Sequence, residues 1–219
     1  MFRKKLLLST VFAISFLGFG KDAEAQTNTG KPKMVKENLA EKFANVSPKL
    51  TSDNANPLLD FMFTADPTAI EYNGRIYVYG TNDHQQYEHV GKDGKNSYEH
   101  IRTLVMMSSN DMVNWTYHGL INTAELAPWS QNSWAPSITS RMEADGKTHF
   151  YLYYSNSGIG TAMLTSTSPV GPWKDPLGKN IVDRSVPGVD VDAPLDPGVV
   201  IDDQGTGWLT LKVLHNLIH

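Results

Sequence analysis

The sequence contains no cysteine among its 219 residues. A disulfide framework is therefore excluded, although such frameworks are common in small exported proteins. The same absence removes the thiol to which a bacterial lipoprotein anchor would be attached. The fold must therefore depend on its hydrophobic core.

The chain also lacks an excess of positive charge. Its formal net charge is −4, from 19 Lys and Arg against 23 Asp and Glu. Residues 1–25 hold four basic and two acidic side chains, so their removal would change the balance from −4 to −6. A negative balance of this size argues against nucleic acid and against an anionic membrane surface as partners.

Long apolar runs are absent except at the N-terminus. Basic residues at positions 3–5 precede an apolar run over residues 6–19, and Ala23-Glu24-Ala25 follows as a small-residue cleavage sequence. This order is typical of a cleavable secretory signal peptide, and the run is short for a membrane span. We therefore expect residues 1–25 to be a signal peptide and the protein to be secreted or periplasmic. An uncleaved anchor or a buried helix is the alternative.

Convincing amphipathic helices of ten residues are missing too, and strand patterns dominate from residue 54 onward. Residues 26–54 are rich in Lys, Asn and Thr, which indicates an N-terminal arm or linker. Residues 55–219 form the expected folded domain, of the all-β class. Within it, the polar stretch 82–100 predicts a long loop, and loops of that length are more often functional than idle.

One sequence pattern is present three times in this domain. Asp66-Pro67, Ala135-Pro136 and Asp196-Pro197 each open an apolar strand that leads into a Gly-containing turn and a second strand. The first turn is Asn73-Gly74, which tolerates the positive φ angles of a tight hairpin. The three starting positions lie 69 and 61 residues apart. The pattern therefore indicates a repeat protein.

Each repeat has the content of one antiparallel sheet. Four strands are expected between residues 66 and 119, and four more between residues 135 and 175, the last a short one at Trp173. Residues 194–211 supply the first half of a third sheet. Four-stranded sheets at this interval are typical of a β-propeller, whose blades pack around a central axis. A sandwich or an open barrel is the alternative.

The number of predicted blades is too small for a closed ring, because the chain has material for about two and a half. Propellers usually have at least four blades. We therefore expect a fragment of a longer fold, arising from a truncated gene, a frameshift near Lys212 or an incomplete chain.

Two carboxylates are candidates for chemistry. Because the first strand of a propeller blade is the innermost one, residues at its start line the central funnel. Asp66 and Asp196 have this position in the first and third repeats, whereas Ala135 has it in the second. Converging carboxylates suit glycoside hydrolysis. The alternative is that Asp before Pro is only a common turn sequence.

Six motifs follow one another along the folded domain. They are Ala65-Asp66-Pro67-Thr68, Tyr77-Val78-Tyr79, Asp111-Met112-Val113-Asn114-Trp115, Trp134-Ala135-Pro136, Gly171-Pro172-Trp173 and the run from Asp196 to Asp203. In this order, and over about residues 55–210, they closely resemble glycoside hydrolase family 43. Enzymes of that family are five-bladed β-propellers that cleave arabinofuranosyl or xylosyl linkages with inversion.

The resemblance implies a role for each candidate carboxylate. Asp66 matches the general base that activates water, and Asp196 matches the carboxylate that tunes the pKa of the acid and positions the sugar. The general acid of the family is a Glu at the start of a later blade, and no Glu of this sequence matches its motif. We therefore assign no acid and expect the 219-residue chain to be inactive by itself.

Four further residues are candidates for binding the sugar. Trp134 precedes an inner strand and could form a platform under a sugar ring, although core packing is the alternative. Asn82 and His84 follow the first hairpin, and Asn156 follows the second, so these side chains could bond sugar hydroxyls. A solvated loop is the alternative for this group.

No cofactor is needed for the expected chemistry, and we assign no metal site. Asp190-Val191-Asp192 lacks the spacing of a calcium loop, and no His can be assigned to a metal at the propeller axis. The expected partner is a carbohydrate of the arabinoxylan, arabinan or xylan type. A non-catalytic carbohydrate-binding propeller or an inactive remnant is the alternative, and a fructan-cleaving propeller is disfavoured because its Asn-Asp-Pro-Asn-type opening differs from Ala65-Asp66-Pro67-Thr68.

Overall fold

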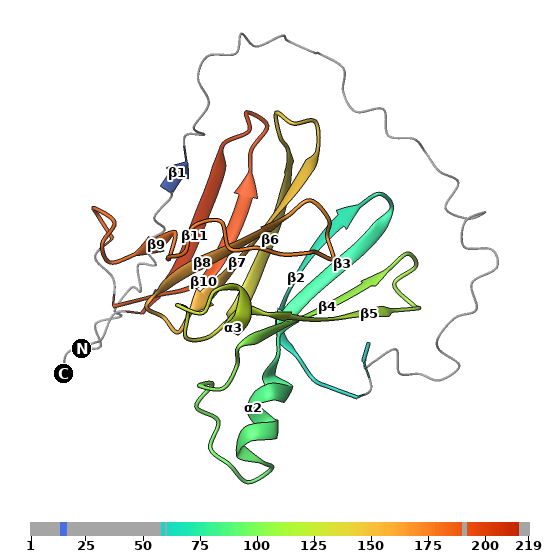
Figure 1. Ribbon diagram of the computed structural model, residues 1–219, viewed down its shortest axis with the longest axis vertical. Helices are drawn as coiled ribbons and strands as arrows, with labels where there is room; N and C mark the ends of the chain where they lie inside the picture. Colours follow the sequence, from blue (N-terminus) through green and yellow to red (C-terminus); the bar gives the residue numbers. More distant parts are fainter. Residues whose placement is uncertain (1–13, 17–57, 60, 190–191, 215–219) are drawn as a thin grey trace, which may run out of the picture.

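The computed structural model describes residues 14–16, 58–59, 61–189 and 192–214 (Figure 1). The predicted linker over residues 26–54 lies outside the described residues, as does the predicted signal peptide except for residues 14–16. Both therefore stay predictions. Within the described residues, no helix is long and apolar enough to cross a lipid bilayer.

The first sheet confirms the predicted four-stranded unit. It consists of β2 (Ala65–Tyr72), β3 (Arg75–Thr81), β4 (Thr103–Ser109) and β5 (Thr116–Asn122), hydrogen-bonded in sequence order. Asn73 and Gly74 form the tight turn between β2 and β3 with φ angles of 52° and 73°. This is the positive-φ turn that the Asn-Gly pair predicts.

The second sheet repeats the same topology. Its strands are β6 (Trp134–Met142), β7 (Thr148–Asn156), β8 (Gly160–Ser166) and the short β9 (Val182–Asp183). The prediction of a fourth strand at Trp173 is wrong. Its neighbour Lys174 forms only an isolated bridge to Thr165, and the fourth strand lies further along the chain.

The third sheet has two long strands, β10 (Ala193–Ile201) and β11 (Gly207–Leu214). Its third member is β1 (Ile14–Phe16), which pairs antiparallel with β11 so that Ile14 lies opposite Leu209. A three-residue segment from the N-terminal apolar run therefore lies along an edge of the third sheet.

Two helices accompany the first sheet: α2 (Asp83–Val90) lies between β3 and β4 in the sequence, and the one-turn helix α3 (Thr123–Leu126) follows β5. Helix α2 lies in the polar stretch that we expected to be a loop, and Asn82 caps it by accepting a hydrogen bond from the Gln85 amide. The hairpin turns of β2–β3, β6–β7 and β10–β11 all point the same way, and α2 projects from the opposite end (Figure 1).

The main hydrophobic core lies between the first two sheets. Tyr79 and Trp173 pack there edge to face with ring centroids 5.9 Å apart, and the Trp173 indole donates a hydrogen bond to the Met106 sulfur at 3.4 Å. A second core joins the second and third sheets through Tyr153, Val182 and Leu209. Sheets that pack face to face in sequence order are successive blades, so the fold is part of a β-propeller.

Candidate functional site

The first strand of each blade begins with the same backbone irregularity. Strands β2, β6 and β10 lie side by side as the inner strands. In each strand the ladder to its neighbour shifts register near the start, and the residue at the shift has a positive φ angle. This angle is 48° at Asp66, 42° at Ala135 and 47° at Asp196. The three predicted funnel positions are therefore equivalent in structure.

The shared backbone conformation does not require a carboxylate side chain. A positive φ is unfavourable for residues with a Cβ, although Asp and Asn tolerate it better than most. Ala135 adopts the conformation without any polar side chain and is buried, whereas Asp66 and Asp196 are exposed. Because the backbone forms the irregularity without a carboxylate, turn formation does not explain the two aspartates. A bulge of this kind re-aims the side chain it carries.

Hydrogen bonds between neighbouring blades hold these strand starts in place. The Ala135 amide donates to the Thr81 hydroxyl and the Asp196 amide donates to the Ser155 hydroxyl, both at 2.8 Å. Three residues further along each strand, the Ile138 amide donates to Thr68. The equivalent bond in the next blade runs from the Val199 amide to the Ser137 hydroxyl at 3.1 Å. The structure thus places the two carboxylates at the same end of the first and third blades, with the second blade between them.

The surroundings of Asp66 are acidic. Its Oδ2 atom lies 3.4 Å from the Thr81 hydroxyl. Asp83, the first residue of α2, lies close enough that burial and the negative charge of Asp66 together raise the pKa of the Asp83 carboxyl. One carboxyl oxygen of Asp83 is buried without a hydrogen-bond partner among the described residues. Sequence reasoning treated Asp83 as a solvated loop residue, since nothing in the sequence indicated that α2 would turn it inward.

Asp196 has a cationic neighbour. The Lys212 ammonium lies 3.3 Å from Asp196 Oδ2, and the two side chains are 61% and 46% exposed. Water therefore screens this ion pair, and its effect on stability is small.

Trp134 is partly buried beside the start of β6. Its indole N–H donates to the Tyr98 carbonyl at 3.0 Å, and the two rings meet edge to face with centroids 6.4 Å apart. Tyr98 is half exposed and has a φ of 60°. The pair presents aromatic surface near the strand starts, which is the kind of surface that sugar rings stack on. Sequence reasoning missed Tyr98 because no periodicity marks it.

His84 lies on α2 against two aromatic rings. Its imidazole is 5.0 Å from the Phe63 ring and 5.9 Å from the Tyr87 ring, centroid to centroid. Nδ1 is buried without a partner among the described residues, while Nε2 lies 3.6 Å from the Glu88 carboxylate. The ring is thus fixed in place and keeps one nitrogen unused.

Asn82 and Asn156 are equivalent residues that anchor loops. Both are buried. The Asn82 amide accepts from the Gln85 N–H and donates to the Thr103 hydroxyl at 2.8 Å. The Asn156 amide accepts from the Gln131 N–H at 2.7 Å and donates to Asn180. Both amides therefore already have protein partners, and their predicted role in sugar binding stays a prediction.

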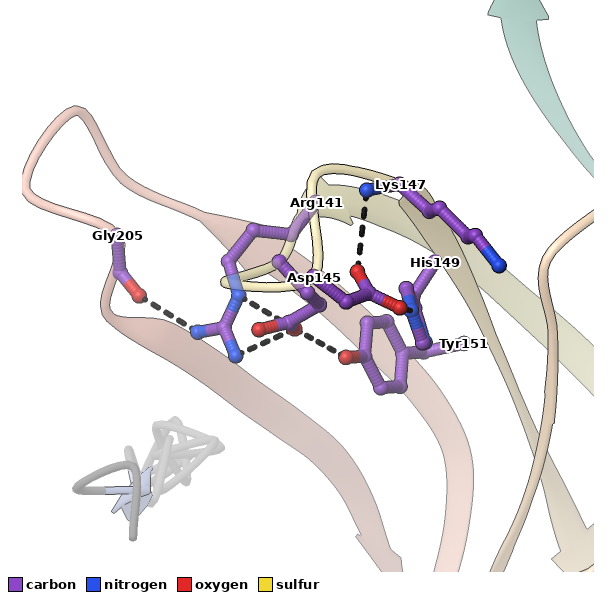
Figure 2. Close-up of polar contacts among 7 residues, drawn as sticks. Arg141, Asp145, Lys147, His149, Tyr151 and Gly205 are labelled. Atoms are coloured by element: carbon purple, nitrogen blue, oxygen red, sulfur yellow. Dashed lines mark hydrogen bonds and ion pairs between the residues drawn. The ribbon is translucent and has the colours of Figure 1, made fainter. Parts of the chain in front are cut away.

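No Glu among the described residues lies at the start of an inner strand. Glu143 follows β6 at its opposite end, where its Oε1 atom accepts hydrogen bonds from two nitrogens of Arg141, at 2.6 and 2.8 Å, and from the Tyr151 hydroxyl (Figure 2). The described residues also contain no group of three or more His, Cys, Asp or Glu side chains arranged to hold a metal ion.

Comparisons with known proteins agree with this geometry. Residues 54–217 match the family model "Glycosyl hydrolases family 43". The arabinoxylan arabinofuranohydrolase of Bacillus subtilis (strain 168) is 45% identical over 166 residues, which cover 71% of this chain and 32% of that protein. The enzyme of the same name from Paenibacillus polymyxa is 40% identical, over 71% of this chain and 26% of that protein.

A solved structure shows the same relation in three dimensions. It is the crystal structure of a family 43 arabinoxylan arabinofuranohydrolase from Bacillus subtilis in complex with cellotetraose. It superimposes with a TM-score of 0.70 and 40% identity, over 78% of this chain and 37% of that chain. This chain therefore spans about a quarter to a third of the curated relatives it matches. The match over residues 54–217 shows that the chain belongs to glycosyl hydrolases family 43.

Proposed function

We propose that this chain is part of a secreted glycoside hydrolase that removes arabinofuranosyl or xylosyl units from plant polysaccharides of the arabinoxylan, arabinan or xylan type. The observation that carries the proposal is the placement of Asp66 and Asp196. Both carboxylates are exposed at the same end of the inner strands β2 and β10, which lie on either side of β6, and both sit on a backbone irregularity that Ala135 of β6 adopts without a carboxylate. The relatives' names support arabinose as the first sugar to test.

In the proposed reaction Asp66 is the general base. Its carboxylate would deprotonate a water molecule, whose oxygen then attacks the anomeric carbon as the glycosidic bond breaks. Asp196 would orient the sugar and tune the pKa of the acid that protonates the leaving oxygen. Inversion requires that acid on the other side of the sugar, with the two carboxyl groups about 6.5–9.5 Å apart.

The acid is the part of the machinery that we do not assign within these 219 residues. Among the described residues, Glu71 accepts a hydrogen bond from Gly74 in a hairpin turn, Glu88 lies on α2 and Glu143 is bound by Arg141. Glu125 lies in the one-turn helix α3, and Glu99, whose carbonyl accepts a hydrogen bond from Asn132 near the start of β6, does not itself begin an inner strand. We therefore propose that the acid comes from a further blade and that the chain alone does not turn over substrate.

Four residues would contact or frame the sugar. Trp134, together with Tyr98, offers an aromatic surface beside the strand starts. His84 would frame the sugar from α2, because its unpaired Nδ1 atom is buried. Asn82 and Asn156 would act by holding the loops that form the rim, because their amides already have protein partners.

The test is to complete the propeller. Residues 58–211 of this chain would replace the matching segment of the Bacillus subtilis arabinoxylan arabinofuranohydrolase, and release of arabinose and xylose from arabinoxylan would be measured with the anomeric configuration of the product. We expect arabinose released with inversion, and a loss of roughly 10²–10⁴-fold in kcat for Asp66→Asn. Asp203→Asn, in the exposed β10–β11 turn, is the matched control and should leave the rate unchanged.

Other outcomes would contradict the proposal. Hydrolysis of aryl arabinofuranosides or xylosides by the chain alone, abolished in Asp66→Ala, would show that the acid is already present. Binding of arabinoxylan that survives Asp66→Ala, with no turnover in the fusion, would identify a non-catalytic carbohydrate-binding propeller instead.

A further inference from the structure

In each blade, a residue near the end of the second strand pairs with the residue just before the positive-φ position of the first strand. The ladders pair Thr81 with Ala65, Ser155 with Trp134 and Lys212 with Leu195, so Thr81, Ser155 and Lys212 are equivalent positions. Each lies next to a residue with a positive φ angle: Asp66, Ala135 or Asp196, respectively. The three blades thus offer three versions of one local arrangement.

All three positions carry a side chain that can donate a proton, but only two of them have a carboxylate beside them. Where the strand-initial residue is Asp66, the Thr81 hydroxyl lies 3.4 Å from its Oδ2 atom. Where it is Asp196, the Lys212 ammonium lies 3.3 Å from its Oδ2 atom. Ser155 has only the methyl group of Ala135 at the corresponding place. A proton donor therefore contacts the strand-initial side chain in both blades that carry a carboxylate there.

The direction of the Thr81 hydrogen bonds follows from the chemistry of a hydroxyl group. A hydroxyl has one donor proton and two acceptor lone pairs. The Ala135 amide can only donate, so Thr81 must accept from it at 2.8 Å. The single Thr81 O–H is then free to point at the Asp66 carboxylate. At 3.4 Å this contact is long for an O–H···O bond, so it acts on the orientation of the carboxylate more than on stability.

Thr81 is itself rigidly held. It is 2% exposed, and its carbonyl accepts a hydrogen bond from the Thr64 hydroxyl at 2.6 Å. The preceding residue, Gly80, allows this close approach, because a Cβ there would lie 2.3 Å from the Thr64 hydroxyl oxygen. The β-branched side chain of Thr also restricts its χ1 rotamers.

We propose that Thr81 is a positioning residue that orients the Asp66 carboxylate while it fixes the start of the next blade. The description of Asp66 as a catalytic base rests on the function proposed above, but the contact between Thr81 and Asp66 does not. Ser155 is the internal control, since it makes the same bond to the next blade with no carboxylate beside it.

The experiment uses the whole 219-residue chain, labelled with ¹³C and ¹⁵N, and requires no turnover. Hydrogen exchange of the Ala135 and Asp196 amides reports the bonds between blades, and the ¹³C shift of the Asp66 carboxyl carbon at neutral pH reports its orientation. In Thr81→Val we expect exchange at Ala135 to become about tenfold faster, as expected for the loss of one hydrogen bond, together with a moved Asp66 signal. Thr81→Ser should retain both wild-type values.

The control variant separates positioning from a purely structural role. Ser155→Ala should speed exchange at Asp196 and leave the Asp66 carboxyl signal in place. If Thr81→Val speeds exchange at Ala135 without moving the Asp66 signal, Thr81 only joins the blades and the proposal is wrong. If Ser155→Ala moves the Asp66 signal equally, the effect is not specific to Thr81 and the proposal is also wrong.

A reciprocal variant covers the case in which Thr81→Val does not fold. Asp66 is exposed, so Asp66→Ala should leave the fold intact. We expect it to move the Thr81 methyl signal and to leave the Ser155 signals unchanged; an unchanged Thr81 methyl would overturn the proposal. Failure of the completed propeller to release sugar would instead refute the proposed function and leave these signals as they are.

Discussion

The acidic side chains at the two ends of the inner strands have different surroundings. At the hairpin end, Glu143 is bound by Arg141 and Tyr151, and Arg141 also donates to the Gly205 carbonyl of the next blade at 3.2 Å (Figure 2). At the other end, Asp66 and Asp196 are exposed, and an oxygen of Asp83 is buried without a partner among the described residues. At the hairpin end the acid belongs to a junction between blades, whereas at the other end the carboxylates of Asp66 and Asp196 face solvent.

The pKa values follow the same division. Although partial burial opposes ionisation of Glu143, hydrogen bonds from Tyr151 and Arg141 hold the pKa of its carboxyl below the usual value. The pKa of Tyr151 is correspondingly raised to about 12, by burial and by the bond to Glu143. The pKa of Asp83 is raised, by burial and by Asp66. Ionisation is therefore favoured for Glu143 at the hairpin end and opposed for Asp83 at the site end, and perturbed carboxyl groups of the second kind are common at functional sites.

The largest effect on stability should follow from Glu143→Ala. The substitution removes the partner of two Arg141 nitrogens and of the Tyr151 hydroxyl, so we expect a loss of about 2 kcal/mol in the free energy of unfolding, measured with urea. This value allows for partial exposure, since the Glu143 side chain is 25% exposed. Glu71→Ala, which removes one exposed hydrogen bond in the β2–β3 turn, is the control and should cost well under half as much. Equal losses would show that the hairpin end is not a specific blade junction.

As the pH rises, ionisation of Glu143 should increase the free energy of unfolding, whereas ionisation of Asp83 should decrease it. Because the folded-state pKa of Glu143 is lowered, its contribution is present above the unfolded value of about 4.3 and is lost as the pH falls through the folded value. Glu143→Gln should therefore be less stable than wild type at pH 7, and the difference should shrink in acid.

For Asp83 the folded-state pKa is raised, so stability is lost as the pH rises above the unfolded value of about 3.9. Asp83→Asn should be more stable than wild type at pH 7 by a few tenths of a kcal/mol, after allowance for screening. This gain should disappear near pH 3. A gain that persists there would mean that charge is not the cause.

The smallest effect is expected for Lys212→Met. The ion pair with Asp196 is exposed on both sides, and such pairs contribute between zero and about 1 kcal/mol. We expect Lys212→Met to shift the urea midpoint by less than Glu71→Ala does. In 1 M salt, the midpoints of Lys212→Met and wild type should coincide. A loss as large as that of Glu143→Ala would place Lys212 among the structural residues.

Much of the fold could be predicted from residues that act locally. Asn73-Gly74 predicted its turn because few other pairs tolerate two positive φ angles, and the repeated Asp-Pro and Ala-Pro starts predicted the inner strands. Trp173 lies in the core between the first two blades. Trp115 instead packs on the opposite face of the first sheet, in a cluster with Leu59 and Met62.

The features that were missed depend on partners distant in the sequence. Helix α2 has weak amphipathicity and is held by its Asn82 cap and by the Arg102 amide, which donates to Gln85, so no periodicity indicated it. The hydroxyls of Thr81 and Ser155 act on the next blade, 54 and 41 residues away. The only trace in the sequence is that each precedes an Asn at the end of a strand.

Ala135 has a consequence for how such enzymes diversify. Its backbone already has the conformation that presents a carboxylate in the neighbouring blades, and a hydroxyl of the preceding blade already holds its amide. One substitution at this residue would therefore add or remove an acidic group without rebuilding a loop. Asp66, Ala135 and Asp196 thus occupy equivalent backbone positions. The blade fixes the conformation of each position, and the side chain present there decides whether it can take part in chemistry.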